Sequence, residues 1–317
     1  MSRALVIGYL TQVSAANVNA SHTEGNVVVT KKLTLPDGST RPYVSGQAIR
    51  RMLRDRLADL GWALSESEAQ VKPNGQEVTP PVRPQAFVDE DLFGYLDPSG
   101  SRRRTSPVRV SAAVGMFAFA GDRDLGTRSF ERFGAAMAEG GNMFETELYA
   151  NLFRGGMLVE LDRVGTFSAL ELHGDKAKKG QPGDQLPADE RKRRVHALLD
   201  ALLLLWGGGR SARLLADFSP RFIALARMEA KHPVFLEALA VRQEDGQPVL
   251  DPAPLVEALR RFDPWRRTTI FGIEPGFLAN EGELREALSP FGRVGTVHEA
   301  IAAAKKDLDE AWNPSSP

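Results

Sequence analysis

A group of arginines follows Ser45, where the sequence predicts the start of a helix. Ser45 is a favourable N-cap residue, and Gly46 allows another segment to come close to the first turn. At about 100° per residue, Arg50, Arg51 and Arg54 lie outside one apolar stripe, which comprises Ile49, Met52, Leu53, Leu57 and Leu60. Free backbone N–H groups, the helix dipole and these arginines together make an anion site. Taken alone, the same pattern favours an ordinary surface helix with solvated arginines.

A second anion-binding pattern is the run Gly207-Gly208-Gly209, which Arg210 and Arg213 follow. The amides of a glycine loop can cradle a phosphate, whose charge the two arginines would neutralise. The run is not a P-loop, because no Gly-Lys-Ser/Thr follows it. By itself it is more typical of a helix C-cap, where glycine takes left-handed backbone angles at no cost.

The residue constellations that catalysis and metal binding require are missing from the sequence. The five histidines have no metal-ligand spacing, the chain has no cysteine, and no Gly-x-Ser-x-Gly motif is present. His22, which stands near Glu24 in a polar segment, is the only histidine suited to chemistry, whereas His196 fits a packed core residue. We therefore expect a protein without enzymatic activity, bound metal or cofactor.

Charge is distributed unevenly along a chain whose formal net charge is only −1. Residues 41–56 hold five arginines and one aspartate, and residues 102–109 hold four arginines and no acid. Residues 270–317 carry four basic and eight acidic side chains. This layout predicts one basic face. Arg56 falls within the apolar stripe of the predicted helix, so it must pair or extend its charged head to solvent.

Length and composition indicate a globular protein with a sizeable core. The chain has 317 residues, of which 42% are hydrophobic, enough for one elaborated domain or two modest ones. No apolar run approaches the ~20 residues of a membrane span, and the N-terminus has no signal-peptide pattern. We expect a soluble, cytoplasmic protein.

The order of the predicted elements is strand, helix, strand, strand, helix, strand, with long insertions between them. This order predicts an α+β fold of the ferredoxin-like βαββαβ type. Strands are expected at residues 3–10, 25–35, 105–119, 157–164, 222–228 and 268–273, and helices at residues 45–61, 189–206, 254–262 and 297–312. Polar loops or linkers are expected at residues 14–23, 70–84 and 173–187.

Four stretches, taken in order, resemble the backbone subunit of type I CRISPR surveillance complexes (Cascade), specifically the DevR-type subunit of subtype I-B in the RAMP superfamily. They are LVIGYLTQVSAANVNASHTEGN at residues 5–26, YVSGQAIRRMLRDRL at residues 43–57, SPVRVSAAVGMFAF with FETELYANLFRGGMLVELDRVG within residues 106–165, and GGGRSARLLADFSPRFIALA at residues 207–226. The resemblance covers residues 3–230. Residues 231–317 carry no such motif and are expected to form a mostly helical extension packed on the rest.

The resemblance implies an RRM-like palm with finger and thumb insertions, which polymerises along a CRISPR RNA. The palm loop would lie at residues 14–22 and the thumb hairpin within residues 119–149. The implied partners are CRISPR RNA, the target DNA strand paired to it, neighbouring copies of the chain and other Cascade subunits, with no membrane. The implied RNA-binding residues are Ser14, Asn17, Asn19, His22, Lys31, Lys32, Arg41, Ser45, Gly46, Gln47, Arg50, Arg51, Arg54, Arg109, Gly208, Gly209, Arg210 and Arg213.

An endoribonuclease is the main alternative, because related RAMP subunits cleave RNA. Cleaving backbone subunits are expected to place an aspartate in the loop after the first strand, and residues 14–23 contain none. Processing nucleases of the superfamily typically use a histidine, for which His22 is the sole candidate in this loop. A regulatory role, suggested only by the family name, is a third alternative. We rank the non-catalytic scaffold first.

Overall fold

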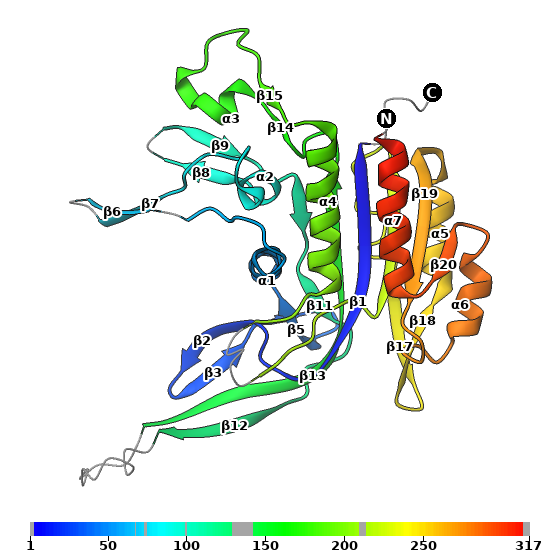
Figure 1. The fold of residues 1–317 in the computed structure, drawn as a ribbon. Coiled ribbons are helices and arrows are strands. Elements are labelled where there is room, and N and C mark those ends of the chain that lie inside the picture. The colour runs from blue at the N-terminus through cyan, green and yellow to red at the C-terminus, as the bar shows by residue number, and fades with distance from the viewer. Residues whose placement is uncertain are drawn as a thin grey trace.

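The computed structural model describes residues 3–66, 68–72, 75–98, 100–128, 142–208 and 214–312. These residues form a mixed α+β structure around one large sheet, with seven α-helices in the described ranges (Figure 1). The α+β class predicted from the sequence is therefore confirmed. Within the same ranges, no helix combines the length and apolarity needed to cross a membrane.

The central sheet has the strand order β20-β19-β16-β1-β13-β11-β5-β4, with β10 also paired to β13. Strand β1 lies in its middle and is antiparallel to both β13 and β16. The bounds are β1 Ala4–Ala16, β4 Lys32–Thr34, β5 Thr40–Val44, β10 Val108–Val110, β11 Ala113–Gly115, β13 Asn142–Glu160, β16 Phe222–Met228, β19 Arg266–Ile273 and β20 Arg293–Gly295. The first eight residues of β1 are all buried, because other parts of the protein cover both faces of the sheet at this strand.

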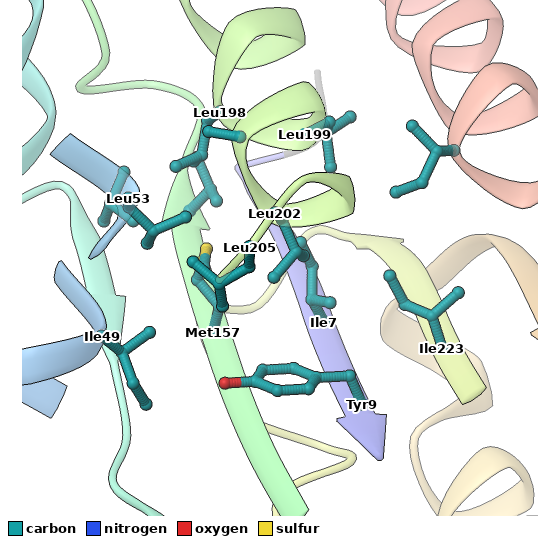
Figure 2. Close-up of a cluster of buried hydrophobic side chains, with 14 of the residues drawn as sticks. Ile7, Tyr9, Ile49, Leu53, Met157, Leu198, Leu199, Leu202, Leu205 and Ile223 are labelled. Carbon is teal, nitrogen blue, oxygen red and sulfur yellow. The ribbon is translucent and has the colours of Figure 1, made fainter. Parts of the chain in front are cut away.

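The two faces of the sheet build two hydrophobic clusters. Alternate residues of a strand point to opposite faces, so Ile7 and Tyr9 pack into one cluster and Val6 and Leu10 into the other. Helices α1 (Gly46–Asp59), α4 (Ala188–Leu203) and α7 (Val297–Ala311) cover the first face, and α5 (Pro252–Arg261) and α6 (Glu281–Leu288) the second. Figure 2 shows the first face, where side chains of β1, β13 and β16 meet leucines of α4 and the apolar stripe of α1.

Several hairpins extend from this body. The longest is formed by β12 and the first part of β13, and it projects away from the sheet beside β2 and β3 (Figure 1). Helices α2 (Val88–Phe93) and α3 (Ala169–His173) accompany smaller strand pairs. The remaining bounds are β2 Ala20–Glu24, β3 Val27–Thr30, β6 Glu68–Lys72, β7 Gly75–Thr79, β8 Tyr95–Asp97, β9 Arg102–Arg104, β12 Gly121–Arg128, β14 Thr166–Phe167, β15 Asp184–Gln185, β17 Ala240–Glu244 and β18 Gln247–Asp251.

The structure confirms some predicted elements and corrects others. Strand β16 has the predicted bounds, and α1 begins after Ser45 as predicted. The expected loop at residues 14–23 is largely strand, because β1 keeps pairing with β13 as far as Ala16 and β2 pairs with β3. The expected loop at residues 70–84 contains the β6–β7 hairpin, and the expected linker at residues 173–187 contains a 3₁₀ turn and β15.

Two further expectations differ from the structure. The expected strand at residues 105–119 is divided into the short strands β10 and β11. Residues 231–317 contain four strands as well as three α-helices among the described residues. One of these strands, β19, pairs with β16 over seven residue pairs, so this part of the chain widens the central sheet.

Candidate nucleic-acid interface

The segment after β1 is attached to the N-terminus of α1. The N–H of Ser45 donates to Oδ1 of Asn19 at 2.9 Å, and the N–H of Ala48 donates to Oγ of Ser45 at 3.3 Å. Ser45 is therefore the N-cap that the sequence predicts. Asn19 fixes the backbone that enters the helix, a contact that the sequence alone did not predict.

The first turn of α1 packs against the end of β10. A Cβ atom on Gly46 would lie 2.3 Å from the carbonyl oxygen of Val110, so only glycine fits there. Gln47, the next residue, is exposed to solvent. The first intrahelical bond is donated by Ile49 to Ser45, so the amides of Gly46 and Gln47 precede the hydrogen-bonded part of the helix.

The glycine run reaches the same region from α4. Helix α4 ends at Leu203 with Leu204 as its C-cap, so the alternative that the glycine run is the helix C-cap is wrong. Gly208 has a φ of +113°, and a Cβ atom on it would lie 2.6 Å from the carbonyl oxygen of Val18. Gly208 thus contacts the residue that precedes Asn19. Gly209, Arg210 and Arg213 lie outside the described residues.

Arg56 links α1 to the segment that leads into the glycine run. Its NH1 donates to the carbonyl oxygen of Trp206 at 2.8 Å, and its Nε donates to Oδ2 of Asp59 at 2.8 Å. The guanidinium carbon lies 4.3 Å from the centre of the Trp206 ring. The expectation that Arg56 must pair despite its place in the apolar stripe is confirmed.

The other arginines of α1 differ in their surroundings. Arg50 donates to the carbonyl oxygen of Phe93, and Arg54 pairs with Asp89 at 3.5 Å, so both are bound to α2. Burial, together with the charge of Arg54, lowers the pKa of Arg50. Arg51 extends into solvent, 78% exposed, and pairs with Asp55. Of the three, Arg51 is the most open to a ligand, and reversing the charge of Arg50 or Arg54 would also disturb the contact with α2.

Three predicted RNA-binding residues are engaged within the protein. Asn17 is buried, and its Nδ2 donates to the carbonyl oxygen of Glu147 at 2.9 Å. Lys32 donates to both carboxylate oxygens of Glu147 at 2.9 Å. Arg41 donates to the carbonyl oxygen of Met116 at 2.6 Å. The sequence suggested free polar groups here, but these side chains hold strands together.

Glu147 is the centre of a polar cluster at the base of the β12–β13 hairpin. It accepts the two bonds from Lys32 and a third from the N–H of Thr30 at 2.8 Å. Although burial opposes ionisation, these hydrogen bonds lower the pKa of the Glu147 carboxyl. The Lys32 ammonium also lies 4.2 Å from the centre of the Phe119 ring. This cluster fixes the direction in which the hairpin leaves the sheet, a role that the sequence analysis missed.

The remaining predicted residues do not form one cluster with Asn19 and Gly208. Ser14 is exposed on β1, Lys31 is half-buried, and His22 is exposed on β2. The imidazole of His22 contacts Oγ of Ser21 at 3.1 Å and Oε1 of Glu24 at 2.9 Å. Arg109 lies on β10 and pairs with the buried carboxylate of Glu160 at 2.6 Å.

The arginine run at residues 102–109 does not form the predicted basic face. Acids elsewhere in the chain pair with three of its four arginines: besides Arg109, Arg102 binds Asp97 at 2.6 Å, and Arg104 binds Asp91 at 2.7 Å. Both side chains of the second pair are fully buried. Arg104 is a core residue rather than a surface cation.

The structure brings together residues from three segments of the chain: Asn19 after β1, Ser45 and Gly46 at the start of α1, and Gly208 after α4. The resulting surface, which we call the junction, combines the backbone amides of Gly46 and Gln47, the exposed Gln47 side chain and the close glycine contacts. Such a surface can bind the oxygens of a phosphate chain without reading bases. Among the described residues, no group of three or more His, Asp or Glu side chains is placed to hold a metal ion.

Comparison with known proteins relates this arrangement to one family. The sequence model of the family described as CRISPR-associated negative auto-regulator DevR/Csa2 matches residues 7–240. A solved chain of a CRISPR RNA-guided surveillance complex is similar in fold, with 18% identity, a TM-score of 0.58, and coverage of 95% of this chain and 99% of that one. A chain of a CRISPR RNA-guided surveillance complex described as pre-nicking has 15% identity and a TM-score of 0.60, covering 95% and 100%. No curated protein sequence matches.

Proposed function

The chain belongs to the CRISPR-associated DevR/Csa2 family, whose model matches residues 7–240, and we propose that it is a non-catalytic, multi-copy subunit that binds CRISPR RNA in a Cascade-type complex. Its neighbours in the complex would be further copies of itself and other subunits, and the guide it holds would pair with a target DNA strand. Subtype I-B is part of this proposal, and it depends on the sequence resemblance.

The observation that carries the proposal is the junction. The amides of Gly46 and Gln47 begin α1 there, Asn19 is bound to the same turn and Gly208 lies against Val18, while the cations Lys32, Arg41 and Arg50 are bound within the protein. A guide scaffold has to accept any spacer sequence, because base pairing supplies the specificity. A surface of amides with few base-reading side chains suits this requirement.

The topology supports an RRM-like palm. The chain order β1–α1–β10–β13–α4–β16 is strand, helix, strand, strand, helix, strand, and the corresponding sheet order is β16-β1-β13-β10 with antiparallel neighbours. These are the features of a ferredoxin-like unit. The β12–β13 hairpin is our candidate for the thumb, since it falls within residues 119–149 and projects from the palm (Figure 1). The part of the thumb at residues 129–141 lies outside the described residues.

The proposal predicts sequence-independent RNA binding without cleavage. Two guide-length RNAs of unrelated sequence should bind the purified protein with similar affinity, measured by fluorescence anisotropy. The affinity should fall with salt, with a slope of about −0.7 per phosphate contact in a plot of log K against log salt. Strong preference for one sequence, or affinity that does not change with salt, would contradict backbone binding.

The second candidate function is RNA cleavage, which the exposed pair of His22 and Glu24 favours. A carboxylate next to an imidazole is a common arrangement in general acid–base catalysis. The same RNAs, incubated with the protein alone or with complementary RNA, should remain intact on a denaturing gel. Cleavage that disappears in His22→Ala would replace the scaffold proposal with the nuclease.

A further inference from the structure

Trp206 presents an aromatic ring at the surface beside the junction. Its side chain is 40% exposed, although the residue follows the buried Leu205. One face of the ring is covered by the guanidinium of Arg56, 4.3 Å from the ring centre. A large aromatic ring that stacks on a cation and remains partly accessible to solvent is suited to binding a ligand rather than to filling the core.

The position of this ring is fixed by the surrounding backbone. The carbonyl oxygen of Trp206 accepts a hydrogen bond from Arg56. The flanking residues pair with the strand-like segment that follows the glycine run: Gly207 donates to Ala216 at 3.1 Å, and Phe218 donates to Leu205 at 2.9 Å. The ring is therefore held in place before any ligand binds, which reduces the entropy lost on binding.

The ring also lies close to the proposed path of the RNA. A Cβ atom on Gly207 would lie 3.6 Å from Cγ of Met52, and Gly208 lies against Val18. Two residues of extended chain span about 7 Å. A nucleic-acid strand bound at Gly208 can therefore reach the ring with an adjacent nucleotide.

We propose that Trp206 is a stacking platform for one unpaired base of the bound RNA, an inference that rests on the proposed function. Every base has a π-face, so stacking accepts any sequence, as a guide scaffold requires. Arg56 would support the ring from behind, its guanidinium being held by Asp59 and the carbonyl oxygen of Trp206. This combination favours RNA over a protein partner, although Leu215 nearby is also 79% exposed.

The test compares RNA that has bases with RNA that lacks them. The probes are an oligouridine and an abasic ribose-phosphate chain of the same length. Trp206→Ala should weaken oligouridine binding roughly tenfold, or ~1.4 kcal/mol, and leave abasic binding unchanged. Trp206→Phe, which keeps a ring, should lose less. Trp265→Ala is the matched control, because Trp265 is 47% exposed but lies after α5, away from the junction.

The outcomes separate this inference from the proposed function. Equal weakening of both probes by Trp206→Ala, with an unchanged melting temperature, would overturn stacking and leave backbone binding intact. Unchanged affinity for both probes with loss of RNA-dependent assembly would assign the ring to a contact with a second copy, which also overturns it. Failure of the unmodified protein to bind either probe would refute the proposed function itself.

Discussion

Gly208→Val is expected to weaken RNA binding strongly and to destabilise the fold. The new Cβ would lie 2.6 Å from the carbonyl oxygen and 2.9 Å from the Cα of Val18, so the junction must open. The φ of +113° adds backbone strain of about 1–3 kcal/mol. If one hydrogen bond from the junction to a phosphate is lost, worth about 1.5–3 kcal/mol, affinity should fall roughly 10- to 150-fold.

Gly38→Val is the matched control for this variant. Gly38 has a φ of +81°, but a Cβ atom on it would have no other atom within 4 Å. A valine at this position therefore introduces the backbone strain without the steric clash. Thermal denaturation and RNA titration of both variants separate the two effects. If Gly208→Val loses stability like the control and binds RNA normally, the junction does not contact RNA.

Asp91→Ala is expected to destabilise the protein by about 3–5 kcal/mol, because two buried cations lose the buried carboxylate that they share. Asp91 accepts from Arg104 at 2.7 Å, from Arg194 at 2.8 Å and from the N–H of Gly165 at 2.9 Å. The side chains of Asp91, Arg104 and Arg194 are each at most 2% exposed. Asp91 therefore joins α2, β9 and α4, and its loss should loosen the region of α2 from the palm.

Asp55→Ala provides the comparison for Asp91→Ala. Asp55 pairs with the exposed Arg51 one helical turn away, and such surface pairs contribute only about 0.3–0.5 kcal/mol. Urea denaturation of both variants measures the difference. Similar losses of stability in the two variants would show that the buried cations find other partners, and would contradict the role given to Asp91.

The sequence predicted the helices and strands whose formation depends on residues close together in the chain. The N-cap at Ser45, the glycine in the first turn and the apolar stripe of α1 were all predictable, because capping and helical periodicity act within a few residues. Strand β16 was equally clear, being short, apolar and buried on both sides. The α+β class followed from the order of such elements.

The distribution of charge on the surface could not be predicted in the same way, because ion pairs join residues far apart in the sequence. Arg104 stands in a run of arginines, yet its partners are Asp91 and Glu171. Lys32 is paired with Glu147, 115 residues away. A basic segment of sequence therefore did not become a basic surface, and the prediction of one basic face failed at residues 102–109.

The candidate site was predicted only in part. Asn19, Ser45, Gly46 and Gly208 were chosen from separate patterns, and the fold brings their segments together: Asn19 binds Ser45, and Gly208 lies against Val18. Asn17 was chosen on the same grounds as Asn19, but it points into the protein, because the prediction placed it in a loop and the segment is largely strand. The role proposed for Trp206 and the structural role of Glu147 depend on tertiary contacts, and the only local signal was the tryptophan directly before the glycine run.

The central claim is that many copies of this chain assemble along one RNA, and light scattering after size exclusion tests it most directly. The 34.6 kDa chain should be measured alone and with two RNAs, one twice as long as the other. Heterologous contacts do not close unless the rotation forms a ring, so RNA length should set the number of subunits. The bound protein mass is expected to roughly double with the longer RNA and to fall at high salt. A complex of the same mass with either RNA, or an RNA-free oligomer that neither RNA changes, would contradict it.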